Sequence, residues 1–525
     1  MDYKNLDEMT SFQNLRKCSK VNVKDILTSK RIKECNIKLG GGLAYNWASK
    51  PVTDEILTSL QALSDEMNLV EKYKAILSGE MMNPGEKRLV LHHLTRGNVL
   101  GKEIVADGED KDAFYKGELK KIEEFSSSVR SGEIVGSTGM RFTTVCQIGI
   151  GGSDLGPRAL YLALKGWAKG SGVQTLEGKF ISNVDPDDAA DVISTLDLES
   201  TLFILVSKSG TTQETLTNRD LVLETLKNTP IDGFDASKHM VAVTSKTSPL
   251  ASDKSMLASF FIDDYIGGRY SSTSAVGGVV LSLAFGFDTF KRLLDGAHDE
   301  DVKSTECDIR KNGALLDALI GMYERNVLDM PSTAILPYSQ ALSRFPAHLQ
   351  QLDMESNGKH VNRFGKACTY PTGPVIFGEP GTNGQHSFYQ LLHQGTDIIP
   401  LQFIGFKNCQ YKKDIITADS YSQTKLNANL TAQIVAFALG KNDENPNKQF
   451  DGNRPSSLIY GDELTPEALG ALLAHFENKV MFQGFLWNLN SFDQEGVQLG
   501  KVLAKKVLAG CQGDDVLASY AELLI

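Results

Sequence analysis

The sequence predicts an α/β fold in which parallel sheets are covered by helices on both faces. Short apolar runs of strand length alternate with longer segments of helical periodicity, which is typical of βαβ units. The chain has 525 residues, and a single core stops growing at about 250–300 residues. Hydrophobic residues make up 41% and charged residues 23%, as in an ordinary globular protein. We therefore expect at least two packed domains.

Residues 1–115 have mainly helical patterns, and we expect them to form a helical segment that packs on the second domain. Residues 52–67 place Ile56, Leu60 and Leu63 at helical spacing. Residues 82–96 begin at an Asn-Pro pair and continue into three leucines, so we expect a second helix there.

The first α/β domain is expected to cover residues 116–285. Apolar runs predict strands at 143–150, 179–184, 202–206 and 240–244. A helical pattern covers 157–168. The boundary near 285 has a margin of about ten residues.

A weaker alternation follows, and we expect a second α/β domain over residues 286–510 with a tail or helix at 511–525. Strands are predicted at 333–336 and 397–404. Helices are predicted at 279–294, 313–323, 422–439 and 466–486.

Composition argues against several classes of protein. The net charge is −11, which disfavours general binding to nucleic acid or an anionic membrane. The seven cysteines include no CxxC pair, so neither a disulfide framework nor a cysteine zinc site is expected. The chain starts without a signal-peptide pattern, and the longest apolar stretch, 275–287, is shorter than the ~20 residues that span a bilayer. We expect a cytoplasmic protein.

Two polar loops follow predicted strands of the first domain. Gly149–Pro157 is rich in glycine, and Ser207–Thr215 holds Lys208 among many hydroxyl groups. In open parallel sheets, ligands lie beyond the carboxyl ends of the strands, and helix N-termini there favour anions. Asp154 breaks a GxGxxG pattern, and Pro157 follows where a P-loop requires lysine. A dinucleotide site and an ATP P-loop are therefore both disfavoured.

Each loop also has a purely structural interpretation. Glycines make tight turns, and Ser or Thr residues cap helices. For the glycine loop the two interpretations stay open. For Ser207–Thr215 the density of hydroxyl donors beside Lys208 favours phosphate binding.

Four further polar segments carry Arg269, Glu355, His386 and Lys501. Taken singly, each has an ordinary explanation. Glu355 has the spacing to pair with Lys359, four residues later, and the others fit an ion pair, a loop histidine and a solvated basic patch. Together they supply a carboxylate, a guanidinium, an imidazole and an ammonium beside a phosphate loop. That set suits proton transfer next to a carbonyl on a phosphorylated substrate. No metal-ligand set stands out.

These segments, taken in order, resemble the glucose-6-phosphate isomerase (phosphoglucose isomerase) family over most of the chain. The matching motifs are IGIGGSDLGP, SKSGTTQET, IGGRYSSTSAVG, QQLDMESNGK, GEPGTNGQHSFYQLLHQG, GNRPSS and FDQEGVQLGK. The resemblance implies two sugar-isomerase (SIS) domains with doubly wound parallel sheets, an N-terminal helical segment and C-terminal helices. It implies a homodimer in which the neighbouring subunit contributes the histidine to a shared active site. It implies no metal or organic cofactor.

The resemblance also implies the reaction and the residue roles. It implies that glucose 6-phosphate and fructose 6-phosphate interconvert in glycolysis and gluconeogenesis through a cis-enediol(ate). Glu355 would carry the proton between C1 and C2, His386 and Lys501 would assist ring opening, and Arg269 would stabilise the enediolate. The residues implied in substrate binding are Gly152, Ser153, Ser207, Lys208, Ser209, Thr212, Gln351 and Gln494.

Two residues depart from the family pattern. Gly210 stands where many members have a bulky side chain, and we expect it to loosen the turn. Glu495 replaces a common aromatic residue, and we expect it to point outward. Three alternatives remain open: a non-catalytic sugar-phosphate sensor, a Schiff-base enzyme that uses Lys208 or Lys501, and a sibling isomerase that also accepts mannose 6-phosphate.

Overall fold

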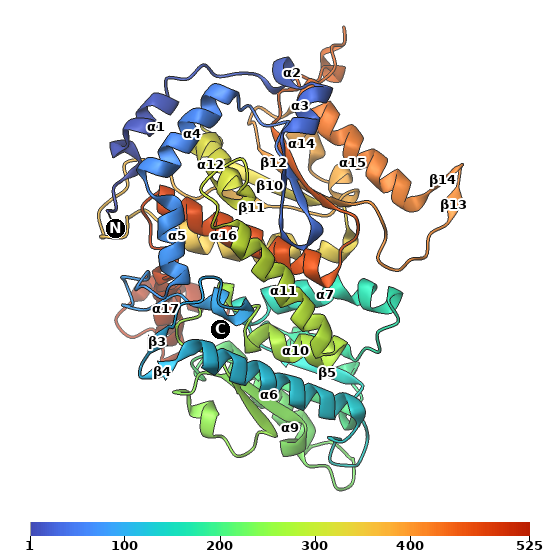
Figure 1. The fold of residues 1–525 in the computed structure, drawn as a ribbon. Coiled ribbons are helices and arrows are strands. Elements are labelled where there is room, and N and C mark those ends of the chain that lie inside the picture. Colours follow the sequence, from blue (N-terminus) through green and yellow to red (C-terminus); the bar gives the residue numbers. More distant parts are fainter. Residues whose placement is uncertain (1) are drawn as a thin grey trace.

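The computed structural model describes residues 2–525 and contains two large sheets. One sheet lies in the lower half of Figure 1 and the other in the upper half, with helices α11 and α16 between them. Helices pack against both sheets, so the α/β class with parallel sheets is confirmed.

The first sheet has five parallel strands in the order β6-β5-β7-β8-β9. Its strands are β5 Thr144–Ile148, β6 Glu177–Ile181, β7 Thr201–Val206, β8 Met240–Thr244 and β9 Ala258–Phe261. Its helices are α6 Lys111–Ser131, α7 Leu155–Gly170, α8 Pro186–Ser194, α9 Gln213–Lys227 and α10 Ala275–Phe285. All four strands predicted here are present, and β9 was missed because it has only four residues. The strand order reverses between β5 and β7, which makes that position the topological switch point.

The second sheet has six strands in the order β1-β2-β15-β12-β10-β11. Four are parallel: β10 Ser332–Pro337, β11 Val375–Phe377, β12 Leu401–Phe406 and β15 Ser456–Gly461. The associated helices are α12 Gly313–Asn326, α13 Phe345–Gln350, α14 Tyr389–Gln394, α15 Ser422–Leu439 and α16 Pro466–Leu486. Helices α15 and α16 match the predicted ranges. Strand β12 begins at Leu401, four residues later than predicted, and β11 and β15 were not predicted.

The N-terminal segment differs from the helical prediction in two places. Strands β1 Asn36–Lys38 and β2 Ala44–Asn46 form a hairpin that extends the second sheet antiparallel to β15. Residues 82–96 are not an α-helix, because Pro84-Gly85 form a turn closed by an Asn83–Arg88 bridge, and only His92–Arg96 form a 3₁₀ helix. The remaining helices are α1 Thr10–Leu15, α2 Val23–Ile26, α3 Ser29–Glu34, α4 Asp54–Glu66 and α5 Leu69–Leu77.

The predicted helix 279–294 is two helices. Gly286 has φ 88°, a left-handed value that only glycine adopts readily, and it separates α10 from α11 Phe287–Lys303. Helix α10 packs on α6 and α7, whereas α11 packs along α16. We propose that the boundary between the two α/β domains lies here, near residue 285.

The core has a central part between the sheets and a smaller part beyond each sheet. Strand β7 shows the division, since Leu202 and Ile204 face the central core and Phe203 and Leu205 face the outer one. Burial on both faces explains the continuous apolar run of this strand. Within residues 2–525, no helix has the length and apolar character needed to cross a bilayer.

Helices α17 Gln498–Leu508 and α18 Asp515–Ala521 end the chain. They pack on each other and on little else, and several of their apolar side chains are exposed. They lie at the left of Figure 1, beside the junction of the two halves.

Candidate active site

The two polar loops lie side by side at the switch point of the first sheet. The glycine loop follows β5 and the hydroxyl loop follows β7, and these two strands are hydrogen-bonded neighbours. Gly152 touches the segment that carries Arg269, since a Cβ on Gly152 would lie 2.2 Å from the Gly268 carbonyl oxygen. A larger residue at 152 would push this segment away, so the glycine loop positions part of the site.

The hydroxyl loop is held by its own side chains. The backbone N–H of Gly210 donates to Ser207 Oγ at 3.1 Å, and Ser207 Oγ donates to Thr212 Oγ1 at 3.3 Å. Thr212 is the N-cap of α9, and its side chain makes no capping hydrogen bond. The free N–H groups of a helix N-terminus, together with nearby hydroxyls, favour an anion.

The expectation that Gly210 loosens the turn is wrong. Gly210 has φ +67°, and a Cβ at this position would lie 2.1 Å from Ser248 Oγ. The glycine permits a left-handed turn that packs tightly against the loop after β8.

Lys208 connects the hydroxyl loop to the segment after β9 that leads to Arg269. Its Nζ donates to the carbonyl oxygens of Asp264 and Ile266, each at 2.9 Å. Burial lowers the pKa of Lys208 below its ordinary value. Its ammonium therefore fixes the chain that leads to Arg269, and its direct contact with a substrate stays a prediction.

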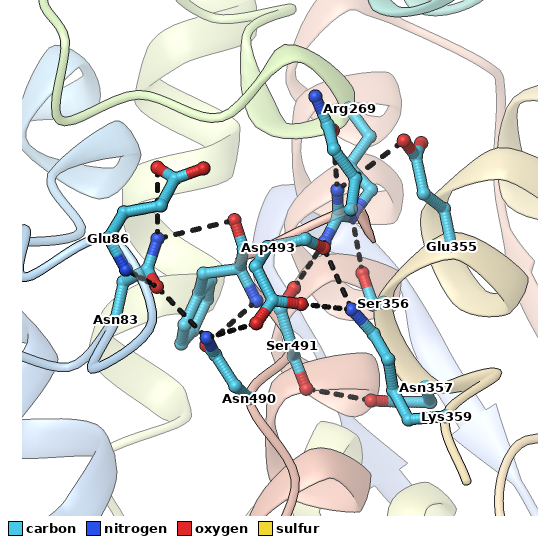
Figure 2. A network of polar contacts seen from close by, with 12 residues as sticks. Asn83, Glu86, Arg269, Glu355, Ser356, Asn357, Lys359, Asn490, Ser491 and Asp493 are labelled. Carbon is cyan, nitrogen blue, oxygen red and sulfur yellow. Dashed lines mark hydrogen bonds and ion pairs between the residues drawn. The ribbon is translucent and has the colours of Figure 1, made fainter. Parts of the chain in front are cut away.

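Arg269 is a buried guanidinium held by four hydrogen bonds (Figure 2). Its Nε donates to Ser356 Oγ at 2.7 Å, and its Nη1 donates to Gln494 Oε1 at 3.2 Å. Its Nη2 donates to the carbonyl oxygens of Ser491, at 2.6 Å, and Asp493, at 3.0 Å. Arg269 thus joins the helix after Glu355 to the turn after α16.

Glu355 ends a π-helical turn, Gln351–Glu355, that continues α13. Such turns are frequent at functional sites. Glu355 Oε1 lies 3.8 Å from Arg269 Nη1, and the side chain is 20% exposed. Its Oε2 is buried and has no hydrogen-bond partner within residues 2–525. The carboxylate is therefore oriented by a cation on one oxygen and free on the other.

Gln351, at the start of the same turn, faces the glycine loop. Its Nε2 lies 3.3 Å from where a Cβ on Gly151 would be, and its Oε1 is buried without a partner in the described chain. Gln494 thus contacts Arg269, and Gln351 lies between the turn that carries Glu355 and the glycine loop. Glu495 is exposed, as predicted.

The structural alternative for Glu355, an ion pair with Lys359, is wrong. Lys359 Nζ pairs with the Asp493 carboxylate and donates to the Asp493 carbonyl oxygen at 2.8 Å. Figure 2 shows the two side chains directed at different partners.

His386 and Lys501 are not joined to this cluster. Both are exposed, and among residues 2–525 neither makes a hydrogen bond or ion pair with Arg269 or Glu355. His386 ends the 3₁₀ helix Asn383–His386 and lines a separate polar pocket with Tyr389, His393 and Asn429. Lys501 lies on the sparsely packed helix α17.

The residues that support the cluster were not predicted from the sequence. Ser356, Ser491 and Asn490 carry many of its hydrogen bonds, and Asn83 joins it from the N-terminal segment. The Asn83-Pro-Gly sequence was itself a turn signal, but it was interpreted as a helix start. In residues 2–525, no three His, Cys, Asp or Glu side chains are grouped as metal ligands.

Comparisons with known proteins identify the family of the chain. The model of the phosphoglucose isomerase family matches residues 46–522. A Treponema denticola protein named glucose-6-phosphate isomerase is 61% identical, with 100% of each chain covered. A Treponema pallidum (strain Nichols) protein of the same name is 57% identical, covering 100% of this chain and 98% of the relative.

The fold matches a solved structure of the same name. The crystal structure of a glucose-6-phosphate isomerase from Chlamydia trachomatis has a TM-score of 0.92 and 40% identity, with 99% of each chain covered. The fold is thus that of a sugar-phosphate isomerase with two SIS-type domains. The chain belongs to the phosphoglucose isomerase family.

Proposed function

We propose that this enzyme reversibly converts D-glucose 6-phosphate into D-fructose 6-phosphate, a step shared by glycolysis and gluconeogenesis. The observation that carries the proposal is the Glu355 carboxylate, which has one oxygen 3.8 Å from the buried Arg269 and the other buried and free. A carboxylate of this kind can accept a carbon-bound proton, and the guanidinium can stabilise the negative charge that results. The relatives named above support the choice of substrate.

The proton transfer is proposed to use Glu355 twice. Its carboxylate takes the proton from C2 of the open-chain aldose, and the C–H electron pair forms the C1–C2 double bond of a cis-enediol(ate). The carbonyl electron pair of C1 moves to O1, and a proton passes from the C2 hydroxyl to O1. The same carboxyl group then returns its proton to C1 while the C2–O bond becomes the carbonyl, which gives the ketose. Arg269 stabilises the enediolate, and the free Oε2 of Glu355 leaves room for the transfer.

The phosphate is proposed to bind between the two loops at the switch point. Ser207, Ser209 and Thr212 supply hydroxyls at the N-terminus of α9, and Gly152 and Ser153 supply the facing backbone. Lys208, whose Nζ is held by the carbonyl oxygens of Asp264 and Ile266, adds positive charge to this loop. Gln351 and Gln494 are proposed to hydrogen-bond the sugar, since Gln494 contacts Arg269 and Gln351 lies between the turn that carries Glu355 and the glycine loop.

His386 and Lys501 are proposed to open the sugar ring in a homodimer. Both side chains are exposed within one chain, which is consistent with a histidine that serves the neighbouring subunit. The exposed apolar side chains of α17 and α18 include Leu499, Val502 and Val516, and burying them against a second copy would be favourable. A cytoplasmic location is also proposed, because all seven cysteines are free thiols.

One assay tests the reaction. Fructose 6-phosphate is supplied with EDTA present, and glucose 6-phosphate is detected by coupled reduction of NADP⁺. We expect full turnover in EDTA and none with unphosphorylated fructose at the same concentration.

The same assay separates the alternatives. A sensor would bind fructose 6-phosphate without turnover, and a Schiff-base enzyme would be inactivated by borohydride only when substrate is present. Turnover of mannose 6-phosphate at a comparable rate would identify the sibling isomerase. No turnover of fructose 6-phosphate by the folded protein would refute the proposal.

A further inference from the structure

Lys359 follows Glu355 by four residues. On a continuous helix this spacing and order would favour an ion pair, but the helix ends at Asn357 and Lys359 lies just beyond it. Its Nζ is instead occupied by Asp493, through the carboxylate and through the carbonyl oxygen at 2.8 Å. Because these side chains are only 16% and 20% exposed, solvent and salt screen the pair weakly.

The Asp493 carboxylate is fixed from its other side. Its Oδ2 accepts a hydrogen bond from Asn490 Nδ2 at 2.6 Å, and the same Nδ2 donates to Asn83 Oδ1 at 2.9 Å. Gly85 packs against the carboxylate, since a Cβ there would lie 3.1 Å from Asp493 Oδ2. The N-terminal turn therefore holds the carboxylate that holds Lys359 (Figure 2).

The carbonyl oxygen of Asp493 is shared by two cations. Lys359 Nζ and Arg269 Nη2 both donate to it, at 2.8 Å and 3.0 Å. The neighbouring carboxylate offsets the repulsion between these cations. Without that charge, Lys359 would lose its carboxylate partner, and Glu355 is the carboxylate nearest to it along the chain.

Other charged and titratable groups surround the turn that carries Glu355. They are Arg269 from the segment after β9, Lys359 and Asp493 from the adjoining turns, Asp353 on the same π-helical turn, Lys479 on α16, and His348 on α13. Arg269 contacts the Glu355 carboxylate, whereas Lys479 pairs with Asp317. Asp353 and His348 are buried. Lys359 is thus the cation nearest to Glu355 along the chain, and its side chain is held by Asp493.

We propose that Asp493 is a positioning residue that keeps Lys359 away from Glu355 and so keeps the catalytic carboxylate free to accept a proton from carbon. The inference rests on the proposed function of Glu355 as the base. An ammonium beside the carboxylate would favour its ionised form and make it a weaker base.

The variant Asp493→Asn tests this by preserving shape while removing charge. We expect kcat to fall about tenfold, a fraction of the ~10²–10⁴ that a positioned base contributes. The acid midpoint of the kcat/KM profile is expected to move to lower pH by about one unit, because a cation near a carboxylate resists its protonation. The substrate phosphate titrates equally with both enzymes, so the difference reports on the protein.

Adding Lys359→Met to Asp493→Asn is the decisive step. The double variant is expected to return the acid midpoint to its wild-type position and to recover most of kcat, since the misplaced ammonium is gone. Glu86→Gln is the matched control, because Glu86 is a carboxylate of the same cluster that faces Asn83 instead of Lys359. It should leave the midpoint in place.

Two results would overturn the proposal: an unchanged acid midpoint in Asp493→Asn, or a loss that Lys359→Met does not reverse. If Asp493→Asn fails to fold by its melting temperature, Asn490→Ala gives the second test. It removes the bond to Oδ2 and is expected to shift the midpoint in the same direction by a smaller amount; no shift would overturn the proposal. Normal turnover by Glu355→Gln would instead refute the proposed function, independently of these variants.

Discussion

At the scale of single residues, Glu355 combines partial exposure, one cationic neighbour and one free oxygen. In the sequence, the presence of Arg269, His386 and Lys501 together with Glu355 suggested its role as a base. Its freedom from Lys359 depends on Asp493, which lies 138 positions away along the chain and was not singled out. Residue types were therefore predictable, and their pairing was not.

We expect Glu355→Gln to keep the fold and to lose at least about 10²-fold in kcat, because an amide cannot accept the proton. KM should change little, since the amide occupies the same space. The measurement is steady-state isomerase kinetics with a melting curve. Glu379→Gln, an exposed carboxylate beyond β11, is the control and should keep wild-type turnover.

Gly210 supports a prediction about the phosphate loop. Gly210→Ala would place a methyl group 2.1 Å from Ser248 Oγ on a left-handed backbone, so the loop must shift and KM for fructose 6-phosphate should rise about tenfold. Gly172→Ala is the matched control, since Gly172 also has a positive φ, +72°, with nothing within 4 Å of its Cβ. It should lower stability by about 1–2 kcal/mol without changing KM. Equal KM values for the two variants would contradict this account.

At the scale of elements, the contact between α11 and α16 is unusually close. A Cβ on Gly470 would lie 1.8 Å from the Leu293 carbonyl oxygen, and a Cβ on Gly296 would lie 1.9 Å from the Glu467 carbonyl oxygen. The two helices approach each other through these glycines. The sequence showed only two helical patterns, because packing distance has no local signature.

Gly470→Ala is accordingly expected to destabilise the protein by about 1–3 kcal/mol, as overpacking of a filled core does. The comparison variant is Gly117→Ala. Gly117 lies in α6, and a methyl group there would have no neighbouring atom within 4 Å. It should raise stability by about 0.8–1 kcal/mol, the helix preference of alanine over glycine. Melting temperatures of both variants test this, and shifts of the same sign would show that α11 and α16 are not tightly packed here.

The N-terminal segment shows how tertiary contacts override local patterns. The hairpin β1–β2 has only three residues in each strand, and pairing with β15 stabilises it. The predicted helix over residues 82–96 would have to continue through Pro84-Gly85, which disfavours it. These residues form a turn instead, and the turn packs on Asn490 and Asp493.

At the scale of the whole molecule, stability should depend on buried histidines. Burial lowers the pKa of His348 to about 4 and that of His93 to about 3, so both are neutral when folded. Between pH 6.5 and 4 the unfolded chain binds more protons at these sites, and stability therefore falls as the pH is lowered.

We expect His348→Leu to flatten the fall in melting temperature between pH 6.5 and 4. Each such histidine contributes up to about 1.4 kcal/mol per pH unit in that window. The exposed His360 provides the control, and His360→Leu should leave the slope unchanged. An identical slope in all three proteins would mean that His348 takes up its proton without unfolding.

The shared active site of the proposed homodimer also belongs to this scale. When inactive Glu355→Gln and His386→Ala proteins are mixed under conditions that exchange subunits, a mixed dimer has one site with both residues intact. Random exchange should restore about one quarter of wild-type activity, since half the dimers are mixed and one of their two sites is complete. A site contained within one chain would stay inactive in the mixture. Light scattering measures the oligomeric state in parallel.

The α/β class, six of the eleven strands in the two large sheets, several of the longer helices and the residues expected to act on a sugar phosphate could be predicted from the sequence alone. Apolar periodicity and glycine–hydroxyl loops are local features, so they are visible along the chain. Three pairings are visible only in the folded chain: the two loops meet at the β5–β7 switch point, Lys359 pairs with Asp493, and Lys208 bonds to two carbonyl oxygens. These pairings join residues far apart in the sequence, and burial and charge select them only once the chain has folded.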